Sequence, residues 1–306
     1  MKLLALLIGL IVERLATNWF HLRELRWLDR IIDIGFDQQR RFDNWPAVIP
    51  VGMLVVALTL PVILIRAGIG DSLYDFPYLI LAITVLFFSL GPKDIGREID
   101  EYCRSLESED DLRIQQSAQA ITEADVFQDP EKRDQQVEAA VCIQANNRLF
   151  AVIFWFIVLG PVGAWLYRIT DLVRRRAVQN NAGTVAQHRS DDPDMGVFSA
   201  AGYLHGWFAW IPARATAIGF GLAGSFDHAK SAWRAPPESK ALSYSERSEQ
   251  LLARVGTAAL AVHSLDGESN VERAVRGVTL AHGLVLRQLF IWAAVIATMT
   301  LYGWSV

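Results

Sequence analysis

Long apolar runs without a charged residue alternate with polar segments along the chain. The uncharged runs cover residues 47–65, 76–92, 149–167 and 288–306. A run of 19 residues would extend roughly 28 Å as a helix, about the thickness of the hydrocarbon core of a bilayer. The pattern therefore predicts an all-α, polytopic helical membrane protein, in which a short polar turn at 66–75 joins the first two runs as a hairpin.

The run at residues 149–167 is unlike the others because it is interrupted. Residues 160–163 read Gly-Pro-Val-Gly, and arginines stand at both ends of the run. A helix broken at membrane depth needs partners for its freed backbone groups and usually lines a cavity. The sequence leaves three interpretations open: a proline kink in an ordinary span, a single crossing with irregular backbone, or a segment that re-enters on the same side.

The N-terminal segments are amphipathic or too short to span. Residues 1–12 are apolar apart from Lys2, and Glu13 and Arg14 follow. We expect a short helix over residues 3–17 that dips into the membrane or packs inside the bundle, with the charged pair at membrane depth or at the interface. In residues 18–46, apolar residues recur at helical spacing between five arginines, which predicts a helix lying on the membrane surface.

Residues 93–148 carry 7 basic and 14 acidic residues. Apolar spacing predicts one helix over residues 95–106 and a second over 110–122. Asp129-Pro130 marks the start of a third helix, which continues into the central run. The single arginine in the turn at 66–75, against five in residues 18–46, places residues 18–46 and 93–148 in the cytoplasm by the positive-inside rule.

The C-terminal half contains a second irregular segment. Residues 198–224 are apolar and aromatic, and we expect two half-helices hinged at Pro212. Arg214 would then point at the central run or extend to the interface. Helices at 251–262 and 271–286 precede the last span, and the arginines at 174–176 leave the side of residues 170–285 open. The predicted regions are 1–92 (surface helix and first hairpin), 93–148 (cytoplasmic helical loop) and 149–306 (membrane region with broken helices and a terminal span).

Composition supports the membrane assignment and excludes some functions. The chain is 52% hydrophobic, its mean hydropathy is +0.23, and its net charge is −4, which argues against nucleic acid as a partner. Cys103 and Cys142 are not spaced as a metal site, and the common phosphate-binding loop is absent. We therefore predict no metal site and identify no cofactor.

Three motifs carry a resemblance to a known family. They are Glu13-Arg14-Leu15, the pattern Phe-Trp-Phe-x-x-Leu-Gly-Pro-x-Gly-Ala-x-x-Tyr-Arg at 154–168, and Trp-Ile-Pro-Ala-Arg at 210–214. In this order they resemble the AmpE family, multi-pass proteins of the Gram-negative bacterial inner membrane that are encoded beside the amidase AmpD and linked to β-lactamase induction. The resemblance implies AmpD or another cell-wall recycling component as a candidate partner, besides the lipid bilayer.

The second and third motifs are also similar to the CobD/CbiB superfamily, membrane amide synthases of cobalamin assembly that use ATP. Residues 144–149 read Gln-Ala-Asn-Asn-Arg-Leu, without the Asp-Gly that the synthases carry before their Gly-Pro run. We therefore favour a regulator or sensor that binds an anionic ligand or a protein partner. An ATP-dependent amide-forming enzyme is the alternative. A transporter is a third possibility, but the sequence shows no inverted repeat of the kind that many transporters contain.

The candidate ligand-binding residues lie at ends or breaks of the apolar segments. Four of them are arginines, whereas Glu13 is the only carboxylate expected at membrane depth, so the excess positive charge suits an anionic ligand in a cavity facing the cytoplasm. Glu13 would orient Arg14 or Arg214. The predicted site residues are Glu13, Arg14, Asn146, Asn147, Arg148, Gly160, Pro161, Gly163, Tyr167, Arg168, Pro212 and Arg214.

Overall fold

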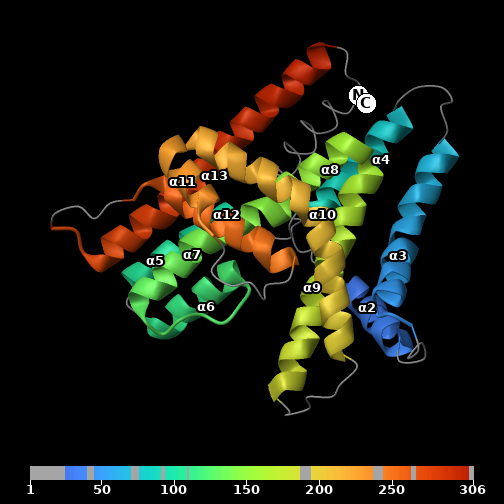
Figure 1. The fold of residues 1–306 in the computed structure, drawn as a ribbon, viewed down its shortest axis with the longest axis horizontal. Coiled ribbons are helices and arrows are strands. Elements are labelled where there is room, and N and C mark those ends of the chain that lie inside the picture. Colours follow the sequence, from blue (N-terminus) through green and yellow to red (C-terminus); the bar gives the residue numbers. More distant parts are fainter. Residues whose placement is uncertain are drawn as a thin grey trace.

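A computed structural model describes residues 25–39, 45–69, 76–90, 94–108, 110–186, 194–236, 244–262 and 267–302. All regular secondary structure in these ranges is helical, so the predicted all-α fold is confirmed (Figure 1). The helices are α2 (Arg26–Gln39), α3 (Val48–Ile69), α4 (Phe76–Ser89), α5 (Ile95–Glu107), α6 (Asp111–Thr122), α7 (Pro130–Ala145), the π-helical turn η3 (Asn146–Phe150), α8 (Ala151–Leu159), α9 (Pro161–Ala186), α10 (Asp194–Ala223), α11 (Phe226–Arg234), α12 (Tyr244–Leu260) and α13 (Asn270–Leu301).

Several helices have the length and composition of membrane spans. Helix α3, the continuous stretch Pro130–Leu159 and most of α13 are long and apolar enough to cross a bilayer, and α4 is a shorter apolar helix. The outer face of α3 remains apolar and exposed, as at Met53, Val56 and Leu64. Exposing so long an apolar surface to water would be unfavourable, whereas the hydrocarbon core of a bilayer would cover it.

The break in the central run is a sharp reversal of the chain. Helix α8 ends at Leu159, Gly160 has φ 69° and ψ −153°, and α9 begins at Pro161. Far beyond the turn the two arms still meet, because the Arg175 guanidinium donates to Gln144 Oε1 at 3.4 Å. The segment is therefore a V-shaped hairpin of η3, α8 and α9 that returns to the side from which it came. Irregular backbone is confined to Gly160.

The structure corrects the prediction for residues 198–224, because α10 is one continuous helix with Pro212 inside it. Proline lacks an N–H, so the carbonyl of Phe208, four residues earlier, loses its helical partner. The indole N–H of Trp155 on α8 donates to this carbonyl at 2.9 Å. The helix thus keeps its course because a neighbouring side chain replaces the missing donor.

A similar contact lies on the other arm of the hairpin. The indole N–H of Trp165 on α9 donates to the carbonyl of Leu58 at 3.1 Å, three residues before Pro61 in α3. Helices α9 and α10 run side by side, and α3 lies against α9 (Figure 1). The two indoles therefore fasten the hairpin to both proline-containing helices that flank it.

The predicted break near residue 287 is also absent. Helix α13 continues from Asn270 to Leu301, whereas the sequence suggested a helix over 271–286 and a separate span. Residues 284–292 contain neither glycine nor proline, so nothing in this stretch ends a helix. The Arg287 side chain donates to the Gly283 carbonyl one turn earlier, which keeps its charge on the helix surface.

The helices expected in residues 93–148 are confirmed. Asp94, Asp110 and Asp129 cap α5, α6 and α7 by accepting hydrogen bonds from backbone N–H groups of the first turn. Such caps satisfy donors that a helix start leaves free. Helix α7 then runs without interruption into η3 and α8, so this helical segment is directly continuous with the hairpin.

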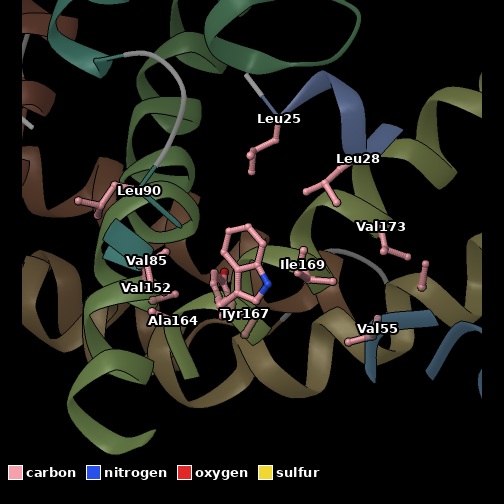
Figure 2. Packing of buried hydrophobic residues seen from close by; sticks show 14 of the residues in the cluster. Leu25, Leu28, Val55, Val85, Leu90, Val152, Ala164, Tyr167, Ile169 and Val173 are labelled. Carbon is pink, nitrogen blue, oxygen red and sulfur yellow. The ribbon is translucent and has the colours of Figure 1, made fainter. Parts of the chain in front are cut away.

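Buried apolar residues form two clusters. The first gathers α2, α3, α4, α8, α9 and the first half of α10, and Figure 2 shows Leu28, Val55 and Ile169 converging there. The second gathers α5, α6, α7, the second half of α10, α11, α12 and α13. The division at residues 92 and 148 stays a prediction, and the clusters group the helices differently, since α7 and α12 share one core.

Helix α2 fixes one end of the first cluster. Its predicted apolar stripe is buried at Leu28, Ile32 and Phe36. On its polar side Asp33 accepts two hydrogen bonds from Arg176 of α9, with Nε at 2.7 Å from Oδ1. Helix α2 therefore lies at the open end of the hairpin, on the same side as α5, α6 and α7.

Candidate functional site

The predicted motif Asn146-Asn147-Arg148 forms η3, and all three side chains are buried. In η3 the Ala151 N–H bonds to the Asn146 carbonyl, five residues back, so the turn is wider than an α-helical one. Single π-helical turns inside α-helices often occur at functional sites. The wider turn lets adjacent polar side chains point into the protein from one helix.

Arg148 is fully engaged by groups of this chain. Its Nη1 donates to Glu98 at 2.7 Å, its Nη2 to Glu123 at 2.6 Å, and its Nε to Gln144 at 3.0 Å. The Arg148 side chain is only 4% exposed. Helix α5 supplies Glu98 and the segment after α6 supplies Glu123, so Arg148 ties both to the hairpin.

A second set of charges gathers around Asp171 on α9. Arg168 donates to Asp171 Oδ2 at 3.0 Å, and Arg175 donates to the same oxygen at 2.8 Å. Arg174 lies 3.8 Å from Asp171 Oδ1 and 2.9 Å from Glu249 of α12. Residues three and four apart share one face of a helix, so Asp171 meets all three arginines without any change of backbone.

Arg175 joins the two sets. Besides Asp171, it pairs with Glu123, which therefore bridges Arg148 and Arg175. We call this group the junction cluster; its members are Glu98, Glu123, Arg148, Arg168, Asp171, Arg174, Arg175 and Glu249. Four arginines face four carboxylates, so Arg148 and Arg168, two of the four arginines expected at the site, find carboxylate partners within the chain.

Glu123 is the most exposed carboxylate of the junction cluster, followed by Glu249 at 23%. The Glu123 side chain is 27% exposed, whereas those of Glu98 and Asp171 are 7% and 0% exposed. Burial alone would raise the pKa of Glu123, but Arg175 and Arg148 hold this pKa below its ordinary value. Glu123 is therefore charged at neutral pH and bonds as a carboxylate.

Neutral polar groups continue the site towards α10 and α13. Asn147 Oδ1 accepts hydrogen bonds from Asn146 at 3.0 Å and from the Tyr167 hydroxyl at 3.4 Å. Thr216 of α10 donates to Asn146 at 2.9 Å, and Gln288 of α13 donates to the Thr216 carbonyl at 3.0 Å. Four helices therefore meet through one buried chain of hydrogen bonds.

Some buried polar atoms beside this chain have no hydrogen-bond partner, notably Asn147 Nδ2, Arg168 Nε and His205 Nδ1. His205 lies against the Tyr167 ring, with ring centroids 5.5 Å apart. A buried polar atom without a partner is costly, and most such atoms in proteins find one. The region between η3, α9 and α10 is thus the least satisfied polar part of the described interior.

The predicted glycines and Pro161 shape the hairpin. The Gly160 backbone adopts dihedrals that are essentially restricted to glycine, and Pro161 occupies the first position of α9, where proline is favoured. Gly163 packs against the backbone of Trp155. These residues bring Tyr167 and Arg168 back towards η3.

Arg214 lies apart from the junction cluster. Its guanidinium stacks on the exposed Trp210 ring, 3.9 Å from the ring centroid, and donates to the Trp210 carbonyl at 3.0 Å. This geometry is typical of an arginine at a membrane interface. Pro212 is buried inside α10, and Glu13 and Arg14 lie outside the described residues.

The whole chain, residues 1–306, matches the family described as "Regulatory signalling modulator protein AmpE". The chain belongs to the AmpE family. The AmpE-like motif at 154–168 forms α8, the turn and the start of α9, and the motif at 210–214 lies on α10. The residues that carry the family resemblance therefore build the hairpin and the helix fastened to it.

Two cobalamin biosynthesis proteins CobD are also similar to this AmpE family chain. The protein from Chromobacterium violaceum is 26% identical over 244 residues, which cover 71% of this chain and 69% of that protein. The protein from Stutzerimonas stutzeri is 25% identical over 161 residues, 50% of this chain and 47% of that protein. No solved structure matches.

Sequence reasoning missed the four carboxylates of the junction cluster. Glu98 could have been found, because it falls on the apolar stripe of α5 between Ile95 and Ile99. Asp171 had a signal as well, since it lies three residues after Arg168 and follows the apolar run. Glu123 lies in a turn and Glu249 on a polar helix, so neither had a pattern to mark it. Among the described residues, no group of three His, Cys, Asp or Glu side chains is arranged to hold a metal.

Proposed function

We propose that the protein is an inner-membrane regulator that modulates β-lactamase induction and cell-wall recycling signalling. The family match over the whole chain supports the regulatory role. The observation that carries the proposal is the junction cluster, which connects helices on the side predicted to be cytoplasmic with a hairpin among the apolar helices. In a signalling protein, a change at one site must alter the conformation at another, and such a connection can couple these helices to the hairpin.

The contacts of the cluster suggest how a change would spread. Glu98 and Glu123 belong to the helical segment before the hairpin, Asp171 to α9, and Glu249 to α12. Because the pairs are buried, moving one carboxylate away leaves a charge without its partner, which costs several kcal/mol. A carboxylate of the cluster therefore leaves its arginines most readily when another anionic group takes its place.

The input to this regulator is an anionic ligand or a protein partner. AmpD or another cell-wall recycling component is the partner that we propose, by analogy with the family to which the chain belongs. Helix α5 offers a surface for such a partner, because its acidic residues Asp100, Glu101 and Glu107 are exposed.

A deletion and complementation experiment tests the proposal. β-Lactamase activity is measured before and after exposure to an inducing antibiotic in the parent strain, in a strain lacking this chain, and in the deletion strain that carries the wild-type gene. We expect the deletion to change the induced activity and the wild-type gene to restore it. An unchanged ratio of induced to basal activity in the deletion strain would contradict the regulatory role.

A second function, ATP-dependent amide-bond formation, has one specific observation in its favour. The chain aligns with a cobalamin biosynthesis protein over 71% of its length. Purified protein can be incubated with ATP, a corrinoid carboxylic acid and an amino alcohol, and the products separated by chromatography. A new amide with matching ATP consumption would favour this enzyme over the regulator.

A further inference from the structure

Glu123 is held differently from the other carboxylates of the junction cluster. Glu98, Asp171 and Glu249 lie within helices, whereas Glu123 is the residue that ends α6. Its backbone has φ 54° and ψ 23°, the left-handed region that residues with a Cβ atom seldom adopt. Uncommon backbone conformations that persist in a protein often mark sites where the conformation itself matters.

The carboxylate of Glu123 occupies a position between two fixed guanidinium groups. One oxygen, Oε1, accepts hydrogen bonds from both Arg148 Nη2 and Arg175 Nη1. Gln144 Oε1 accepts from the same two arginines on a different edge, at 3.0 and 3.4 Å, and keeps them side by side. The two guanidiniums therefore form a preformed pair that a carboxylate oxygen can bridge.

The charges behind this pair remain when Glu123 is taken away. Glu98 still neutralises Arg148, and Asp171 still neutralises Arg175. Without Glu123, however, the junction cluster has four arginines and three carboxylates. The exposed edge of the pair would then carry one positive charge, in a place where arginine prefers a carboxylate.

The segment that carries Glu123 is held by polar contacts at the surface, among them Gln115 to Gln128 at 2.8 Å, and by Val126, which packs against the second apolar cluster. Residues 123–129 connect α6 to α7 without regular structure, and most of them are exposed. Gln136 of α7 bonds to the Asp125 carbonyl at 2.9 Å and to the Phe127 N–H at 3.2 Å. These hydrogen bonds are exposed to solvent, so water can replace either partner at little net cost in free energy.

We propose that Arg148 and Arg175 form a binding site for the carboxylate group of an acidic ligand, and that Glu123 occupies this site as an internal substitute. This deepens the proposed function and rests on it, because ligand binding would displace Glu123 and release residues 123–129 as the regulatory change. Once the arginines bind the ligand, Glu123 can leave the left-handed backbone conformation. Relief of this uncommon conformation favours the displacement of Glu123.

The test uses Glu123→Gly in the full-length protein, purified in detergent. Glycine adopts positive φ freely, so this substitution removes the carboxylate without adding backbone strain. Thermal unfolding is followed while sodium acetate replaces sodium chloride at constant ionic strength. We expect acetate to raise the unfolding midpoint of Glu123→Gly, as a ligand of the folded state does, and to raise that of the wild type less.

Two control variants define the site. Asp125→Asn changes a carboxylate in the same segment that has no arginine partner among the described contacts, so acetate should act on it as on the wild type. Adding Arg175→Met to Glu123→Gly removes one half of the pair and should abolish the acetate effect. An acetate effect of equal size in all variants, or stabilisation by phosphate but not by acetate, would overturn the carboxylate site.

A second measurement keeps the proposal open to refutation if Glu123→Gly does not fold. Hydrogen exchange of residues 123–129 is measured in the wild type at increasing acetate, again against chloride. Displacement of Glu123 predicts faster exchange in this segment and unchanged exchange in α7; no change would refute it. This result is read on purified protein, so it is separate from the induction assay that decides the regulatory role.

Discussion

Replacing Gly163 by alanine should destabilise the hairpin, because this glycine lies directly against helix α8. A Cβ atom at Gly163 would collide with the carbonyl oxygen of Trp155 and would lie 2.6 Å from Leu159 Cβ and 3.2 Å from the Trp155 carbonyl carbon. Two of these atoms belong to the backbone and cannot rotate away. Helix α9 would have to move from α8 by about 1 Å to restore ordinary carbon contacts.

The size of the effect follows from the cost of overpacking. Inserting one carbon into a packed interior costs about 1–3 kcal/mol, which outweighs the roughly 0.5–1 kcal/mol that alanine gains over glycine inside a helix. Gly52 in α3 is the matched control, because a Cβ atom there meets nothing within 4 Å. We therefore expect Gly52→Ala to be neutral or stabilising and Gly163→Ala to lower the free energy of unfolding.

Both variants can be compared by thermal unfolding in the same detergent, with the folded fraction followed by size-exclusion chromatography. A loss of 1–3 kcal/mol corresponds to a lower midpoint by roughly 2–4 °C per kcal/mol. Equal midpoints for the two variants would refute the close packing of α8 on α9, and with it the tight reversal at Gly160.

Three further predictions concern the hairpin and its charges. Gly160→Ala should lower the free energy of unfolding by about 1–3 kcal/mol, because its dihedrals suit only glycine; circular dichroism during heating measures this loss. Trp155→Phe should cost about 1 kcal/mol by leaving the Phe208 carbonyl without a donor, and this cost should shrink in a Pro212→Ala background that restores an N–H. The pKa of Glu123 is lower in the folded protein than its ordinary value of 4.5, so the ionised carboxylate stabilises the fold at any pH above 4.5. This contribution disappears as the pH falls through the folded-state pKa. The unfolding midpoints of the wild type and Glu123→Gln should therefore differ by a constant amount from about pH 6 to 8 and converge below pH 4.5; a difference that grows in acid would contradict the assignment.

Much of the fold could be predicted from local sequence. The caps at Asp94, Asp110 and Asp129 mark helix starts through a chemistry that depends on the next three residues only. The continuity of α10 could not be predicted, because Pro212 breaks a helix unless a donor reaches the freed carbonyl. That donor is Trp155, which precedes Pro212 by more than fifty residues.

The candidate site was predicted in part, for a related reason. Asn147, Arg148, Tyr167 and Arg168 do come together, since each flanks the break in the central run and the reversal at Gly160 joins the two arms. The carboxylate partners of Arg148, which are Glu98 and Glu123, lie in other segments, where only tertiary packing decides which charge becomes buried. Counting charges within apolar segments alone therefore missed the carboxylates that pair with Arg148 and Arg168.

The most direct test of the account is the induction of β-lactamase by cells that carry Glu123→Gln in place of the wild-type residue, compared with Asp125→Asn at equal abundance in the membrane. Glutamine keeps the size of Glu123 but removes the charge that bridges the two arginines. If the junction cluster controls the regulator, the ratio of induced to basal activity should change about fivefold or more in Glu123→Gln, the range of a typical coupling energy, and should match the wild type in Asp125→Asn. Wild-type ratios in both strains would contradict the claim that this cluster carries the signal.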